Sequence, residues 1–335
     1  MTDLESAIRP AARADILLGE GIERQAVKTL NAGALANGWL IVGGEGIGKA
    51  TFAYRLARAL LWSERPPGCD SLDLPQSSRA FSLVASGGHP DLFTAARIYD
   101  EKKERYATEI TVDTIRELTH FLSHTASMGG WRVAIIDTAD DLNRSSANAL
   151  LKALEEPPPR TAIFVLSAAP GRLLATIRSR CRRIELRPLA DNAIADFLAR
   201  EGAATGEDAI RIARAAGGRP GFALSLALGD GAEAVNTVEA FWTSACAGGD
   251  ISTVAQRLAG KTGDGIWPHF HAMLVSRMAD EARREALTGG EFAGRFADLR
   301  EEVDLLFTRG EAVNVDRAQL VLAAGRAFSR VYAAV

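Results

Sequence analysis

A glycine-rich loop that ends in a lysine is the feature that most constrains the fold of this chain. Gly43, Gly48 and Lys49 have the G-x-x-x-x-G-K spacing of a phosphate-binding loop (P-loop), and Gly46 adds another glycine between them. The apolar run WLIV (39–42) precedes the loop, and an amphipathic helical pattern follows it. In such loops backbone N–H groups surround phosphate oxygens at a helix N-terminus, and the lysine reaches the terminal phosphates. The order strand, loop, helix therefore predicts a P-loop.

The residues after the lysine depart from this motif. A Ser or Thr normally follows the lysine and holds Mg²⁺, but Ala50 stands there and has no side-chain oxygen. Thr51 comes one residue late, about 100° around the helix. A dinucleotide-binding pattern beginning at Gly44 would need glycine in place of Lys49. The alternative is a glycine-rich turn between strand and helix that binds no ligand.

The residues that follow a second apolar run also lack one of the groups needed for hydrolysis. VAII (133–136) is typical of a buried parallel strand, and it leads into Asp137, where P-loop enzymes place an acidic Mg²⁺ ligand. Many such ATPases continue with a Glu that polarises the attacking water, but here Thr138 follows, and Asp140 and Asp141 come too late. We predict a P-loop fold that has lost hydrolysis and leave nucleotide binding open. The candidate nucleotide-binding residues of this degenerate site are Gly43, Gly46, Gly48, Lys49, Thr51 and Asp137.

Strand-like and helical patterns alternate up to Pro188. The run IFVL (163–166) and residues 183–186 are typical of further strands, and a helix is expected at 146–155. Another helix is expected from Asp113, its candidate N-cap, to about residue 124. Strands separated by helices predict a three-layer α/β domain with a mainly parallel sheet.

Two segments of this half lack a clear period. Residues 63–90 are rich in Pro, Gly and Ser, which predicts a long connection. The charge run 97–105 predicts a solvated loop or hairpin tip.

The strand signal largely disappears after Pro188. Two short helices are expected at 191–201 and 207–216, and the remainder from about residue 231 is helical. One of its helices should end at Gly310, and the last should begin near Val315 with Asn314 as its cap. The pattern predicts a small helical domain followed by a larger one.

Composition excludes several classes of protein. The net charge of −3 argues against a generally basic protein that coats DNA. Three distant cysteines cannot form a disulfide framework or a four-thiolate zinc site, and we expect no zinc and no other metal site. The N-terminus lacks a secretory signal pattern, and no apolar run approaches the length of a membrane helix. These features predict a cytoplasmic protein with no membrane partner.

Arginines gather towards the end of the α/β half. A solvated basic face is the ordinary interpretation for most of them. One guanidinium could also project into the active site of a neighbouring subunit, where its planar fork of donors suits phosphate oxygens, or the edge could contact DNA phosphates. Spacing alone does not choose among these. The cluster consists of Arg172, Arg178, Arg180, Arg182, Arg183 and Arg187.

Taken together, these residues resemble a family. GGEGIGKAT (43–51), GWRVAIIDTADDLN (130–143), SSANALLKALEEPPP (145–159), IFVLSA (163–168) and IRSRC (177–181) are similar to segments of the delta-prime subunits of bacterial DNA polymerase III clamp loaders, in the AAA+ group. The run ANALLKALEEPP followed by SRC is the most specific part.

The resemblance implies an AAA+-type P-loop domain at 1–188, a small helical lid at 189–230 and a helical collar for oligomerisation at 231–335. It implies partners, which are the gamma/tau ATPase subunits, the delta subunit, the sliding clamp and primed DNA. It also places Arg180 in the SRC position, as a trans arginine finger towards a neighbouring ATPase.

Two departures bear on the role within this family. Relatives often carry a four-cysteine zinc module after the P-loop helix, whereas 63–90 contains only Cys69. Active relatives carry a nucleotide-sensing Arg after the lid, whereas here Pro220 stands in the equivalent place beside Arg219. This turn and the degenerate P-loop favour a non-hydrolysing subunit that needs no cofactor, and the missing cysteines mean that no zinc is expected. The alternatives are an ATP-hydrolysing motor subunit of the same complex and an arginine-rich DNA-binding scaffold.

Overall fold

The computed structural model divides the chain into two compact units. The first consists of Met1–Ala193 with Gly217–Phe222, and the second of Ile194–Ala216 with Ala223–Val335. The division into three domains expected from the sequence stays a prediction. The structure describes residues 9–31, 38–100, 105–290 and 292–332.

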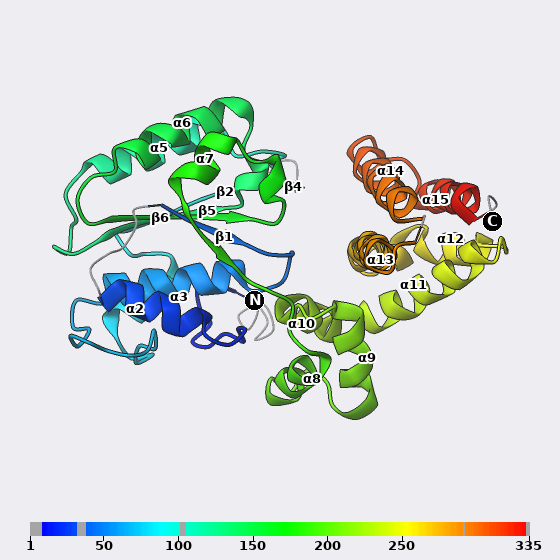
Figure 1. Ribbon diagram of the computed structural model, residues 1–335, viewed down its shortest axis with the longest axis horizontal. Helices are drawn as coiled ribbons and strands as arrows, with labels where there is room; N and C mark the ends of the chain where they lie inside the picture. The colour runs from blue at the N-terminus through cyan, green and yellow to red at the C-terminus, as the bar shows by residue number, and fades with distance from the viewer. Residues whose placement is uncertain (1–8, 32–37, 101–104, 291, 333–335) are drawn as a thin grey trace. The chain divides into compact units, whose positions relative to one another are not determined.

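A five-stranded parallel sheet forms the centre of the first unit, in the order β2-β5-β6-β1-β7 (Figure 1). Val42 at the end of β1 lies opposite Ser167 of β6, and Asp137 at the end of β5 lies opposite Ala96 of β2. The register therefore brings the carboxyl ends of these strands to one edge, where open α/β sheets bind ligands. The strands are β1 (Gly38–Val42), β2 (Leu92–Ala96), β5 (Arg132–Asp137), β6 (Thr161–Ser167) and β7 (Arg182–Glu185).

Helices cover both faces of this sheet, and alternate strand residues contribute to two hydrophobic cores (Figure 1). Ile41, Ile135 and Phe164 face the core that α2 and α3 complete, whereas Leu40 and Val165 face the core of α5, α6 and α7. Successive strand side chains point to opposite faces, so fully apolar runs are what a doubly covered sheet requires. The three-layer α/β class is confirmed. The helices are α2 (Ile22–Asn31), α3 (Lys49–Leu61), α5 (Val112–Ser123), α6 (Arg144–Glu155) and α7 (Ala175–Arg180).

The long connection after α3 contains a helix that its composition concealed. α4 (Arg79–Ser86) begins after Ser78, whose hydroxyl accepts the N–H of Phe81 at 3.2 Å, and it ends at Gly87, which is in the left-handed conformation. Eight helical residues are too few to stand out against the surrounding Pro, Gly and Ser.

The charge run forms the expected hairpin. β3 (Tyr99–Asp100) pairs antiparallel with β4 (Arg105–Tyr106), while residues 101–104 lie outside the described residues. The exposed rings of Tyr99 and Tyr106 pack edge-on with centroids 5.1 Å apart.

Two expected helix caps are wrong by two residues. α5 is capped by Thr111, whose hydroxyl accepts a backbone N–H at 3.3 Å, and Asp113 lies in the first turn. Asp316, not Asn314, accepts a backbone N–H at 2.9 Å at the start of α15 (Arg317–Tyr332). Each of these side chains can cap a helix, so the path of the backbone decides which one does.

The second unit is built from helices in its described part. Ile266, Phe270, Leu274 and Met278 form one buried stripe. The Phe241 ring packs edge-on against Phe270 and Phe328, with centroid distances of 5.7 and 5.3 Å. The other helices are α8 (Asp191–Arg200), α9 (Gly206–Ala216), α10 (Pro220–Leu228), α11 (Gly231–Cys246), α12 (Ser252–Leu258), α13 (Trp267–Thr288) and α14 (Ala293–Ala312).

The prediction that a helix ends at Gly310 is wrong, because α14 continues past this residue. It lies inside the helix, where an added Cβ would be 2.4 Å from a methyl group of Leu320 on α15. The glycine therefore allows these two helices to approach closely. Within the described residues, no helix is both long enough and apolar enough to span a membrane.

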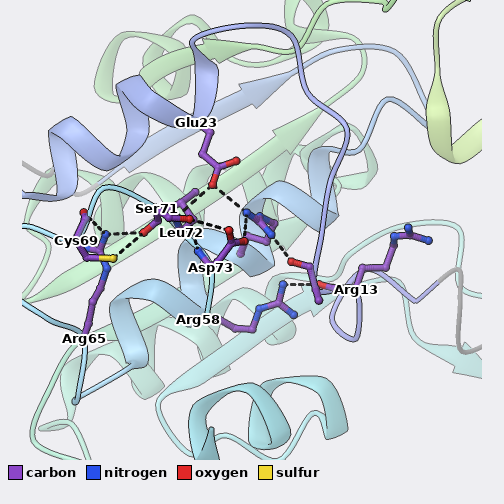
Figure 2. A network of polar contacts seen from close by, with 10 residues as sticks. Arg13, Glu23, Arg58, Arg65, Cys69, Ser71, Leu72 and Asp73 are labelled. Atoms are coloured by element: carbon purple, nitrogen blue, oxygen red, sulfur yellow. Dashed lines mark hydrogen bonds and ion pairs between the residues drawn. The ribbon is translucent and has the colours of Figure 1, made fainter. Parts of the chain in front are cut away.

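Two buried arginines of α3 attach the N-terminal segment to the first unit. Arg55 contacts Glu23 at 2.9 Å and Asp73 at 2.8 Å, and it donates to the carbonyl of Ala14. Arg58 donates to the carbonyl of Ala11 at 2.9 Å. In Figure 2 the Glu23 and Asp73 carboxylates converge on this network from α2 and from the connection after α3.

We expect Arg55→Ala to lower the free energy of unfolding by about 2 kcal/mol, because it removes a buried guanidinium that joins three segments. Urea-induced unfolding, followed by tryptophan fluorescence, measures this change. The matched control is Arg116→Ala, whose exposed ion pair with Asp113 should contribute less than about 0.5 kcal/mol. Equal urea midpoints for the two variants would contradict the prediction.

Candidate functional site

The P-loop between β1 and α3 requires glycine at two positions for steric reasons. Gly43 has φ +154, and an added Cβ would lie 2.8 Å from the carbonyl oxygen of Leu186. Gly46 has φ +73, and its added Cβ would lie 2.6 Å from Cβ of Phe222. Gly48 is the N-cap of α3. The backbone therefore approaches neighbouring segments at positions where a side chain would collide.

The ammonium of Lys49 is turned back onto its own loop. Its Nζ donates to the carbonyl oxygens of Gly43 at 2.9 Å and Gly44 at 3.0 Å, and the residue is only 8% exposed. Burial lowers the pKa of Lys49, while the charges of Asp137 and Asp140 act in the opposite direction. The group that would reach a terminal phosphate is thus engaged by the protein.

The start of α10 contacts the tip of the loop. The backbone N–H groups of Gly221 and Phe222 both donate to the carbonyl oxygen of Gly46, at 2.8 and 3.3 Å. The guanidinium carbon of Arg219 lies 4.4 Å from the centroid of the Phe222 ring. The positive charge of Arg219 also lowers the pKa of Lys49. This contact could not be predicted from the sequence, because nothing in either segment indicates that they meet.

The acidic residues at the end of β5 and shortly after it have different hydrogen-bond and ion-pair partners. Asp140 accepts hydrogen bonds from the Ser167 hydroxyl at 2.7 Å and from the N–H of Ala168 at 2.6 Å, which fixes the end of β6. Asp141 pairs with Arg97 at 3.3 Å. Burial raises the pKa of Asp137, and the charge of Lys49 opposes that shift. Of the three carboxylates, Asp137 is the one without a described hydrogen bond or ion pair.

These residues do not fit the Mg²⁺ ion of a hydrolysing P-loop. Mg²⁺ prefers oxygen ligands in octahedral geometry. Position 50 offers only a methyl group, and the buried side chain of Thr51 lies one residue further along α3. Asp140 and Asp141 are held by other partners. The chain retains the shape of the loop and one acidic side chain of the usual set.

The arginine cluster lies on the surface of the first unit, and all six side chains are exposed. Arg180 is the last residue of α7, and only Cys181 separates it from β7, which forms one edge of the sheet. Its Nη2 contacts Glu155 Oε1 at 2.7 Å, and its Nη1 donates to the carbonyl of Thr176 at 3.1 Å. Arg182 lies over the Trp39 ring at 5.2 Å. Burial raises the pKa of the neighbouring Cys181 thiol to about 11.

The connection after α3 is held by hydrogen bonds in the region around Cys69. Arg65 donates to the carbonyl of Cys69 at 3.1 Å and to that of Ser71 at 3.0 Å, and the Cys69 thiol also points at the Ser71 carbonyl (Figure 2). Across the part of the chain that the structure describes, no three His, Cys, Asp or Glu side chains gather as metal ligands.

We expect Gly46→Ala to destabilise the protein more than Gly129→Ala. Both glycines have φ +73, so both substitutions have the same backbone cost of about 1 kcal/mol. Only Gly46 faces a neighbour, whereas an added Cβ at Gly129 meets nothing within 4 Å. The collision with Phe222 should add about 1–3 kcal/mol, measurable as a difference in urea midpoint. Equal losses would show that the loop and α10 separate at no cost.

Comparison with known proteins identifies relatives of the first unit. The sequence model of the family described as "DNA polymerase III, delta subunit" matches residues 20–190, just over half of the chain. DNA polymerase III subunit delta' of Escherichia coli is 36% identical over 212 residues, which cover 63% of this chain and 60% of that protein. The same subunit of Pseudomonas aeruginosa is 39% identical over 146 residues, covering 44% of this chain and 42% of that protein.

A relative with another subunit name matches as well. DNA polymerase III subunit tau of Escherichia coli is 29% identical over 186 residues, covering 54% of this chain and 26% of that protein. The matched region thus spans less than two thirds of each of these relatives. The region matched by the family model contains the P-loop, Asp137, Glu155 and Arg180, which are residues of the first unit. On the strength of the family match and the delta' relatives, this chain belongs to the delta-prime family of bacterial DNA polymerase III clamp-loader subunits.

Proposed function

We propose that this chain is a non-hydrolysing delta-prime subunit of a DNA polymerase III clamp loader and helps to place a sliding clamp on primed DNA. The observation that carries the proposal is Ala50, which offers no oxygen for Mg²⁺ directly after Lys49 in a P-loop that is otherwise retained. A protein that only needs the loop as a rigid element can retain its glycines and lose its catalytic oxygens.

The absence of the usual catalytic groups supports a subunit without its own turnover. Hydrolysis of a nucleoside triphosphate requires a metal ion on the phosphates and a group that orients the attacking water. Thr138 stands where the water-orienting carboxylate is expected, and Asp140 holds Ser167 instead. We therefore infer that no cofactor is required, although the loop could hold a nucleotide without turning it over.

The position of Arg180 supports a role at a neighbouring subunit. Its guanidinium lies at the end of a helix beside the edge strand β7, and its side chain is 35% exposed. A guanidinium in such a place can cross a subunit boundary and bind the phosphate oxygens of a nucleotide in trans. The neighbour would be a gamma/tau ATPase, and the similarity to a tau subunit agrees with a shared scaffold.

The helical half completes the proposal. We infer a P-loop domain at 1–188, a lid at 189–230 and a collar at 231–335 through which the subunits assemble. The other partners are the delta subunit, the sliding clamp and primed DNA, and the place of action is the cytoplasm.

The purified chain should hydrolyse no ATP above the level of its Lys49→Ala variant. The reason is the missing Mg²⁺ ligand at Ala50 and the missing carboxylate at Thr138. Steady-state phosphate release at saturating ATP and Mg²⁺ measures the turnover. Activity that persists through further purification and disappears in Lys49→Ala would favour the motor-subunit alternative.

In the complex reconstituted with the gamma/tau and delta subunits, Arg180→Ala should reduce clamp- and DNA-stimulated ATP hydrolysis by about 10³-fold at the site it serves. Arg180→Lys should restore little, because an ammonium cannot form the bidentate fork. The readout is steady-state ATP hydrolysis, with assembly checked by gel filtration.

The control is Arg187→Ala, an exposed member of the same cluster, which should have a much smaller effect. Normal turnover in a correctly assembled Arg180→Ala complex would reject the arginine-finger role. Strongly salt-dependent DNA binding by the isolated chain would then favour the scaffold alternative.

A further inference from the structure

The guanidinium of Arg180 is held by two acceptors of its own chain. Glu155, the last residue of α6, contacts Nη2 at 2.7 Å, and the carbonyl oxygen of Thr176 accepts from Nη1 at 3.1 Å. The pair therefore joins the carboxyl ends of α6 and α7. Both side chains remain partly exposed, at 35% for Arg180 and 45% for Glu155.

Glu155 lies at a well-defined point of the backbone. It ends a twelve-residue helix whose inner face, including Leu150 and Leu154, is buried against the sheet. Three prolines (157–159) follow shortly after it and restrict the chain beyond the helix. The backbone that carries the Glu155 carboxylate is therefore fixed relative to the sheet, which limits where the carboxylate can place its partner.

The geometry leaves part of the guanidinium available. An arginine has five N–H donors. The Thr176 carbonyl accepts from Nη1 and the Glu155 carboxylate pairs with Nη2, so N–H donors remain for a two-pronged contact with phosphate oxygens. The ion pair thus orients the group without using up its capacity to bind.

We propose that Glu155 is a positioning residue for Arg180: it holds the guanidinium towards the subunit boundary in advance of contact with a neighbour's nucleotide. This inference rests on the proposed role of Arg180. Free arginine side chains have many rotamers, and fixing one before binding reduces the entropy that is lost in the contact. Glu155 itself touches no nucleotide.

The size of the effect follows from the exposure of the pair. Exposed ion pairs are weak, so removing Glu155 should lower the stimulated kcat of the assembled complex by only about three- to fivefold, far less than removing Arg180. The KM for ATP should stay within about twofold, because a finger that acts in the transition state contributes little to ground-state binding.

The test compares Glu155→Ala, Glu155→Gln and Arg180→Ala in the reconstituted complex. Glu155→Gln should lie between the wild type and Glu155→Ala, because its amide oxygen is a polar partner for Nη2 but lacks the charge of the carboxylate. The double variant Glu155→Ala/Arg180→Ala should be no slower than Arg180→Ala alone, because a positioning residue has no effect without the group it positions. The matched control is Glu156→Ala, the adjacent exposed glutamate, for which no ion pair is present among the described residues.

The outcomes separate this inference from the proposed function. If Arg180→Ala has normal turnover, the arginine-finger role itself fails. If Arg180→Ala is slow but Glu155→Ala matches the Glu156→Ala control, the finger stands and the positioning role is rejected. A Glu155→Ala complex that is faster than the wild type would also reject it, because the carboxylate would then be competing with the phosphate for the guanidinium.

Discussion

The burial of one parallel sheet on both faces is the constraint on which the first unit depends. Residues of β1, β5 and β6 alternate between two cores, so each strand must be apolar at every inner position. Polar and glycine residues are then confined to the ends of the strands. The P-loop, Asp137 and Ser167 meet at one edge for this reason, and the site is a consequence of how the sheet is covered.

At that edge the protein supplies partners for its own polar groups. Lys49 binds two carbonyls of its loop, Asp140 holds the end of β6, and the start of α10 donates two N–H groups to Gly46. Each of these contacts satisfies a group that would otherwise need water or a ligand. These contacts within the protein hold the P-loop in a defined shape.

Arginine has several distinct roles in this chain. Arg55 and Arg58 are buried and join the N-terminal segment to α3, where a planar group with five donors can bind carboxylates and carbonyls together. Arg219 lies beside the P-loop, and Arg180 is oriented at the edge of the sheet. These arginines differ in their surroundings and therefore in what they bind. The number of arginines in the sequence does not predict the role of any one of them.

The sequence by itself determined the fold class, the place of the P-loop and the loss of its Mg²⁺ ligand. The period of the apolar residues indicates which faces of the helices and strands are buried. The lack of a side-chain oxygen at Ala50 follows from the residue type alone. The short helix α4 and the capping roles of Thr111 and Asp316 were not predicted, because local composition allowed several equivalent choices. Only the tertiary structure decided that Lys49 binds its own loop, that α10 begins against Gly46 and that Glu155 holds Arg180. These contacts join segments far apart in the sequence or depend on how a side chain folds back, and neither leaves a periodic pattern along the chain.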